Sequence, residues 1–153
     1  MWYMDKLTID VRVPTQARPG TVYALLRDGS TWPAWSPIGS FELATPGADE
    51  PEGLGAVRIF RTGRVTSVEQ IVELVPDRRF GYALEHGLPI RDYRADVDLA
   101  TDGDVTTIHW HSTFDAKVPG TGWFYRRFLT AFIRRCATGL AAHAVSESSP
   151  HAR

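Results

Sequence analysis

The sequence of 153 residues predicts a single α+β domain, in which a curved antiparallel sheet of seven strands wraps around one long C-terminal helix. Three observations lead to this prediction. Residues 40–116 form consecutive strand-like runs that are separated by clusters of Gly, Pro and Asp. Another alternating run stands near the start of the chain, and residues 122–145 contain no proline and follow a helical apolar pattern. A sheet with one apolar face needs a cover, which such a helix supplies.

The first strand is predicted over residues 6–13, where apolar and polar side chains alternate. A short helix follows around residues 22–26, because three aliphatic side chains there share one helical face. Pro33 and Pro37 limit the next stretch to a single helical turn at residues 30–35. Two short helices are therefore expected between the first and second strands.

The central part of the chain predicts six further strands. They are expected at residues 40–44, 56–61, 65–75, 79–86, 93–100 and 106–116. The turns between them are short and rich in Gly, Pro and Asp, and this spacing favours consecutive hairpins. The expected sheet is therefore an antiparallel meander. The stretch GLPIRD at residues 87–92 is predicted to be one of its hairpin turns.

The last helix is predicted from residue 122 to about residue 145, which corresponds to a length of roughly 36 Å. Its apolar side chains share one broad arc. That arc contains Phe124, Tyr125, Phe128, Leu129, Ala131, Phe132, Ile133, Cys136 and Leu140. Residues 1–146 are expected to form the domain, and residues 147–153 a polar, disordered tail.

Composition excludes several classes of protein. The net charge of -1 provides no overall field that would attract nucleic acid. No apolar run approaches the ~20 residues of a membrane span, and the first residues do not resemble a signal peptide. The single cysteine, Cys136, is predicted to be an inert core thiol in a cytoplasmic protein. Whether the chain forms a homodimer is left open.

Strand parity predicts which polar side chains face the interior. Tyr82, His86, Tyr93 and Ser112 are expected to point inward, together with Gln70, although Ile71 disagrees with that choice of face for residues 65–75. Parity fails for Arg58, whose direction stays open, and Arg135 falls inside the apolar arc of the last helix. The predicted ligand-binding set is Trp35, Gln70, Tyr82, His86, Tyr93, Trp110, Ser112, Phe124, Phe128, Phe132 and Arg135.

His109 and His111 stand two residues apart, so both lie on one face of a strand. Two imidazoles are metal ligands, but the sequence indicates no third ligand and the face is predicted to be solvated. We therefore expect neither a metal nor a cofactor.

Several motifs resemble those of the START-like (helix-grip, SRPBCC) superfamily, and in particular the bacterial polyketide cyclase/dehydrase and lipid-transport family. They are WPAWSPI, GLGAVRIFRTG, VELVPDRRFGYAL, GLPIRDYRADVDL and TTIHWHSTFDA, followed by the closing helix. The resemblance covers nearly the whole chain. It implies a helix-grip fold whose interior is apolar with a few polar groups, and it provides no catalytic motif to transfer.

Three functions are compatible with the sequence. The first is binding of a hydrophobic or aromatic small molecule, polyketide- or lipid-like, in a cavity between the sheet and the last helix. The second is a cyclase/dehydratase, for which Tyr82, His86, Tyr93, Arg58 and Arg135 are the candidate catalytic residues. The third is a module that binds another protein, for which the sequence offers no specific support.

Overall fold

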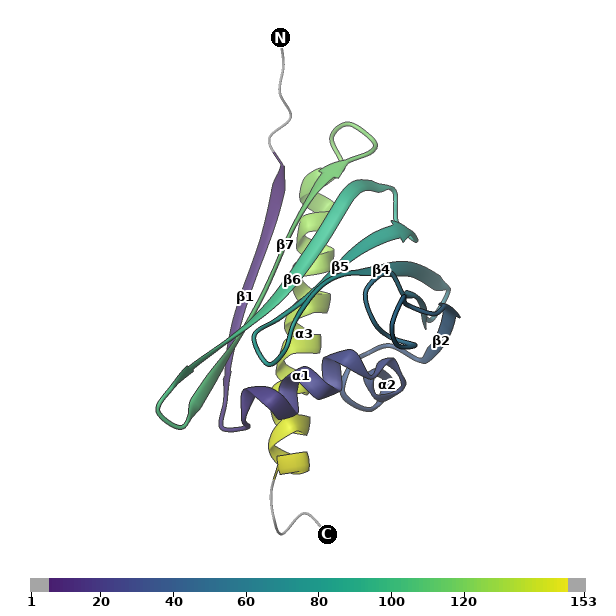
Figure 1. Cartoon of the computed structure of the whole chain (residues 1–153). Helices are drawn as coiled ribbons and strands as arrows, with labels where there is room; N and C mark the ends of the chain where they lie inside the picture. The colour runs from purple at the N-terminus through teal and green to yellow at the C-terminus, as the bar shows by residue number, and fades with distance from the viewer. Residues whose placement is uncertain (1–5, 149–153) are drawn as a thin grey trace.

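A computed structural model of the chain describes residues 6–148, and it confirms the predicted fold class (Figure 1). The strands are β1 (Leu7–Thr15), β2 (Ser40–Thr45), β3 (Val57–Thr62), β4 (Val65–Val75), β5 (Arg79–His86), β6 (Ile90–Asp102) and β7 (Val105–Ala116). The helices are α1 (Pro19–Arg27), the 3₁₀ turn η1 (Gly29–Thr31), α2 (Trp32–Trp35) and α3 (Gly122–Ser148).

The seven strands form one antiparallel sheet in the order β1-β7-β6-β5-β4-β3-β2. Every neighbour pair except β1 and β7 is joined by a hairpin or a local connection, as expected for a meander. Figure 1 shows the sheet curving across α3, with α1 and α2 beside the C-terminal half of that helix. The curvature creates an inner face toward α3 and an outer face away from it.

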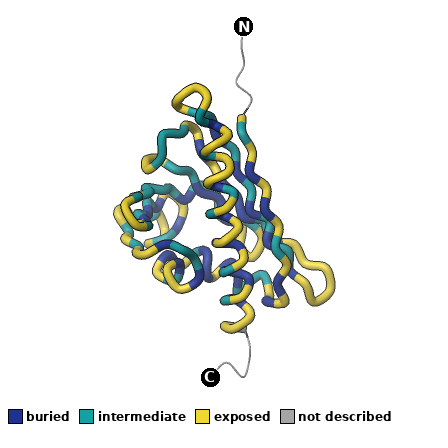
Figure 2. Tube along the Cα trace, turned by 180° about the vertical axis from the view of Figure 1, so that it is seen from behind, coloured by how far each residue is buried: buried dark blue, intermediate teal, exposed yellow. Residues whose placement is uncertain are grey.

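The long helix α3 buries one side and exposes the other, which Figure 2 shows as alternating dark blue and yellow segments. Its buried side holds Leu129, Ile133, Cys136 and Leu140, which join the core. Gly139 faces α2, where an added Cβ would overlap the carbonyl oxygen of Trp35. Glycine therefore permits the close approach of the two helices. Among the described residues no helix is long and apolar enough to cross a membrane.

Several boundaries differ from the sequence-based expectation, among them those of α1, β6 and α3. The helix α1 begins at Pro19, before the predicted start near residue 22, because the first turn of a helix does not use the backbone N–H that proline lacks. The turn before β6 is shorter than predicted, since Ile90 already lies in the strand. The helix α3 extends to Ser148, two residues into the predicted tail, and residues 149–153 lie outside the described part of the chain.

Candidate functional site

The inner face of the sheet carries a buried positive charge. Arg58 of β3 has an exposed fraction of 0%. Its guanidinium carbon lies 5.1 Å from the ring centre of Trp32, 5.1 Å from that of Phe60 and 5.0 Å from that of Phe80. Three aromatic faces around one cation give a favourable electrostatic environment without neutralising its charge. The structure therefore settles the direction of Arg58, which parity left open.

Hydrogen bonds satisfy only part of this guanidinium. Nη1 donates to the carbonyl oxygen of Leu26 and to Oε1 of Glu52, each at 3.1 Å. Nε and Nη2 are buried and have no partner in the protein. Burial lowers the pKa of Arg58, and the carboxylates of Glu69 and Glu52 oppose that shift. An arginine nevertheless keeps its charge in a protein, so two charged donor groups lack an acceptor.

Glu69 of β4 lies directly opposite Arg58 across the strand pair, so both side chains face the interior. Its Oε1 is buried and accepts no hydrogen bond from the protein. Burial raises the pKa of Glu69 to about 7, although the positive charge of Arg58 opposes the shift. A carboxyl group with this pKa exchanges a proton near neutral pH.

Two tyrosines and a tryptophan complete the aromatic surroundings of this pair. Trp110 Nε1 donates to the hydroxyl of Tyr82 at 3.2 Å, and the rings of Tyr82 and Tyr93 lie 6.3 Å apart. Burial raises the pKa of both tyrosines, so each hydroxyl stays protonated. Ser112 is also buried, and its Oγ has no partner in the protein. Donors and acceptors without partners thus occur within one aromatic interior.

The interior is less covered toward the N-terminal half of α3. Leu84, Ile90, Tyr125 and Phe132 pack against the core but are only half-buried. Phe124 and Phe128 on the same half of α3 are exposed to 52% and 46%. Large apolar side chains that remain accessible beside a polar interior are typical of a site that takes up an apolar molecule.

The interior around Arg58 and Glu69 contains several of the residues that the sequence predicted to bind a ligand. Tyr82, Tyr93, Trp110 and Ser112 are buried on the inner face, as parity predicted. Trp35 is buried as well, with its ring 6.4 Å from that of Trp110.

Two predicted residues point the other way. Gln70 pairs with Val57 and Ala83, and its neighbour Ile71 occupies the inner face instead. His86 is exposed, because a bulge between Val68 and Glu69 shifts the pairing with β5. The predicted inward direction of Gln70 and of His86 is therefore wrong.

Arg135 does not reach the polar interior. It is exposed and lines a groove along the outer side of α3 together with Arg127, Arg134 and other residues of that helix. This is the rim position that a long charged side chain commonly takes.

The sequence pattern does not predict Glu69 as an inner residue. The inner side of β4 carries Ser67 and Glu69 as well as Ile71, so an apolar count favoured the opposite face. The disagreement of Ile71 was the signal that could have found it. A polar residue on the inner face of a strand breaks the apolar pattern, and such breaks are expected at functional sites.

Comparison with known proteins agrees with this architecture. The sequence profile of the family described as polyketide cyclase / dehydrase and lipid transport matches residues 4–145. No curated protein matches the chain at a significant level.

Solved structures resemble the chain over most of its length. A START superfamily protein from Mycobacterium smegmatis has a TM-score of 0.76 at 13% sequence identity, covering 90% of this chain and 96% of its own. XoxI from Bacillus cereus has a TM-score of 0.74 at 17% identity, covering 93% and 98%. The major latex-like protein 151 from Panax ginseng has a TM-score of 0.71 at 15% identity, covering 92% and 98%. At these identities the likeness establishes a START-like fold.

Proposed function

Because this chain belongs to the polyketide cyclase/dehydrase and lipid-transport family, we propose that it binds an apolar or aromatic small molecule between the inner face of the sheet and α3. The observation that carries the proposal is the set of buried polar atoms without protein partners inside an aromatic interior. Leaving such a group unpaired costs roughly 1–3 kcal/mol, and more when it is charged. A ligand that pairs with these atoms recovers this free energy.

The polar atoms define the chemistry of the bound end. Arg58 offers two donor nitrogens, Nε and Nη2, which require an acceptor such as a carbonyl oxygen. Glu69 Oε1 requires a donor when ionised, such as a phenol or enol hydroxyl. A flat molecule with neighbouring keto and hydroxyl groups meets both needs, and this pattern is typical of a polyketide.

The apolar part of the ligand would bind among half-buried and exposed apolar side chains of α3 and the sheet. Phe128 and Phe132 on α3, with Leu84 and Ile90 on the sheet, would surround a ring system or acyl chain. Removing such surface from water contributes about 25 cal/mol per Å². Affinity would then come from the aromatic rim, and selectivity from Arg58 and Glu69.

Binding can be tested with 2-naphthol, a flat ring system that carries one hydroxyl donor, titrated by calorimetry at pH 8. Glu69→Gln should weaken binding by about 10-fold or more, since a hydrogen bond to a charged group contributes about 1.5–3 kcal/mol. Gln70→Ala, the adjacent residue on the other face, serves as the matched control and should leave the affinity unchanged. Native mass spectrometry after incubation with a metabolite extract would then identify the natural ligand. A chain that takes up nothing in either experiment contradicts the proposal.

A second candidate function, a cyclase or dehydratase, is favoured by the pKa of Glu69 near 7 beside a buried arginine. The Glu69 carboxylate would take a proton from a carbon between two carbonyl groups, and Arg58 would stabilise the enolate oxygen. The enolate carbon would bond to a second carbonyl carbon, and the resulting alkoxide would take the proton back. Tyr82 and Tyr93 would orient the substrate, whereas the exposed His86 and Arg135 have no place in this step.

The enzymatic alternative is tested by turnover of a short poly-β-ketone. Glu69→Gln should reduce kcat by 10²-fold or more, because general base catalysis typically contributes 10²–10⁴-fold. Tyr82→Phe and Tyr93→Phe should mainly raise KM. If Glu69→Gln binds 2-naphthol more weakly and the wild-type chain turns over no polyketone, the protein is a carrier rather than an enzyme.

A further inference from the structure

The outer face of the sheet carries a second cluster of titratable side chains, separate from the interior. Asp98 of β6 and His109 and His111 of β7 each offer a ligand atom, and these atoms lie within 4.8 Å of one another. The two imidazole rings are stacked, with centres 4.4 Å apart. All three side chains are partly exposed, so water and ions reach them.

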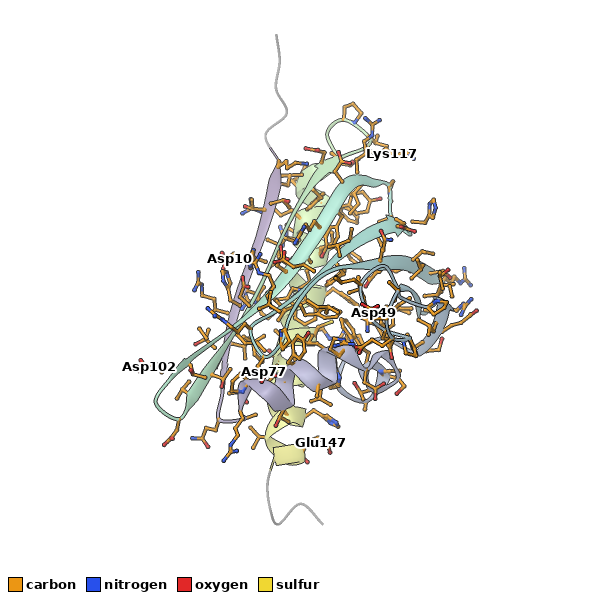
Figure 3. All side chains as sticks on the ribbon, in the orientation of Figure 1. Asp10, Asp49, Asp77, Asp102, Lys117 and Glu147 are labelled. Carbon is orange, nitrogen blue, oxygen red and sulfur yellow. The ribbon has the colours of Figure 1, made fainter. Side chains whose placement is uncertain are left out.

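The strand register builds this cluster. His109 and His111 are two residues apart and therefore share the outer face of β7. Asp98 lies directly opposite His109 on one side, and Asp10 of β1 lies directly opposite His111 on the other. Asp10 lies midway along β1 (Figure 3). The sheet thus presents two imidazoles between two carboxylates.

Hydrogen bonds already align these groups. His111 Nε2 lies 2.6 Å from Asp98 Oδ2, and His109 Nε2 lies 3.1 Å from Asp10 Oδ1. Arg79 donates to both oxygens of Asp98, from Nε to Oδ1 at 2.6 Å and from Nη2 to Oδ2 at 3.0 Å, which fixes the carboxylate plane. A charged group that orients a ligating carboxylate is a common feature of protein metal sites.

We propose that Asp98, His109 and His111 form a binding site for a divalent transition-metal ion such as Zn²⁺. Two imidazole nitrogens and one carboxylate oxygen suit zinc, nickel and copper, and are a poor set for magnesium or calcium. Tetrahedral ligands at about 2.0–2.1 Å from zinc lie roughly 3.3 Å apart. His111 and Asp98 would separate by less than about 1 Å to admit the ion.

The fourth position has a candidate on the edge strand. The side chain of Asp10 is 59% exposed and can turn toward the ion from β1. With Asp10 as ligand, the metal would link β1, β7 and β6. Four carboxylates surround the site, those of Asp10, Glu73, Asp96 and Asp98, and they face three guanidinium groups, those of Arg12, Arg79 and Arg94. The local charge therefore stays negative, which favours a cation.

The site is tested by titrating Zn²⁺ into the tag-free, metal-stripped full chain by calorimetry, with Co²⁺ absorption as the spectroscopic probe of coordination. The wild-type chain should bind one ion, and the Co²⁺ bands should show nitrogen and oxygen ligands in a tetrahedral arrangement. His111→Ala and His109→Ala should each weaken binding by 10-fold or more. Asp10→Asn should weaken it less, by a few-fold.

Matched controls distinguish this site from adventitious binding by other histidines. His86→Ala and His143→Ala remove imidazoles outside the cluster and should leave zinc affinity unchanged. Failure of the wild-type chain to bind zinc at 100 μM, or equal affinity in the His109 and His111 variants, would overturn the proposal. Because the cluster lies on the outer face, binding of 2-naphthol should be the same with and without the metal.

Discussion

Each face of the sheet holds one pair of an arginine and an acid, and the two pairs differ in how fully their polar atoms are hydrogen-bonded. On the outer face, Arg79 binds both oxygens of Asp98, at 2.6 and 3.0 Å. On the inner face, Arg58 and Glu69 stand directly opposite each other, yet both retain atoms without partners. Each pair joins an arginine to an acid across neighbouring strands. Only the inner pair is poorly satisfied.

The pKa values of the two acids express this difference. Burial alone would raise the pKa of Asp98, but the hydrogen bonds from Arg79 and His111 lower it below its usual value. Burial raises the pKa of Glu69 to about 7 despite the charge of Arg58. Exposed ion pairs contribute little to stability, whereas a buried charge without its partner is costly. The outer pair is satisfied by hydrogen bonds within the protein, whereas the inner pair retains donor and acceptor atoms that are open to a ligand.

The largest expected effect comes from removing the inner cation. Arg58→Ala should lower the free energy of unfolding by about 3–5 kcal/mol, because it leaves a cavity among three rings and removes the donor to Glu52 and to the carbonyl oxygen of Leu26. Urea denaturation at pH 7 measures the change. Arg79→Ala on the outer face is the matched comparison. Equal losses in the two variants would contradict the distinction between the faces.

The raised pKa of Glu69 should make the free energy of unfolding depend on pH. Between about pH 4.5, the ordinary value for a glutamate, and about pH 7, native Glu69 holds a proton that the unfolded chain has released. Stability therefore falls as the pH rises through this window, and the loss is complete above it. The free energy of unfolding of Glu69→Gln should consequently be about 1–3 kcal/mol higher than that of the wild type at pH 8. At pH 4 the two values should be equal. If the two variants differ in stability by the same amount at pH 4 and pH 8, the pKa of Glu69 is not raised in the folded protein.

A smaller change is expected when one hydroxyl leaves the aromatic interior. Tyr82→Phe removes the acceptor of Trp110 Nε1, so a buried N–H loses its partner. This should cost about 1–2 kcal/mol in thermal or urea unfolding. Tyr125→Phe on the half-buried rim is the control and should cost less than about 0.5 kcal/mol. A negligible effect of Tyr82→Phe would indicate that water already reaches Trp110.

The smallest expected effect is on the outer face. Arg79→Ala should cost about 0.2–1 kcal/mol, and this cost should shrink further in high salt, because exposed pairs are screened. The measurement is the urea midpoint at 0.05 M and 1 M NaCl. A loss above about 2 kcal/mol that is independent of salt would place Arg79 and Asp98 with the buried charges instead.

Much of the fold was predictable because it follows from local periodicity. The ranges predicted for β4 and β5, residues 65–75 and 79–86, coincide with the observed strands. The predicted inner faces of β6 and β7 are also correct, since Tyr93 and Ser112 are buried. Over residues 93–99 and 106–114 every apolar side chain lies at the same parity as its neighbours in the strand.

The candidate site was harder to predict, because its polar groups stand where the strand pattern expects apolar ones. Glu69 made the inner side of β4 look like an outer side, so Gln70 was assigned in its place. His86 was assigned inward because a bulge is not visible in strand parity. Both errors arise from the pairing between strands rather than from the strands themselves.

The sequence by itself determined the fold class, the strand ranges and the long closing helix, because alternation and helical periodicity depend on neighbouring residues. Only the tertiary structure decided that Arg58 faces Glu69 and that Asp98 lies opposite His109, since these residues are far apart in the chain and meet through register. Register depends on the packing of the whole sheet and on its bulges. Both proposed sites therefore depend on cross-strand pairs, which no local pattern encodes.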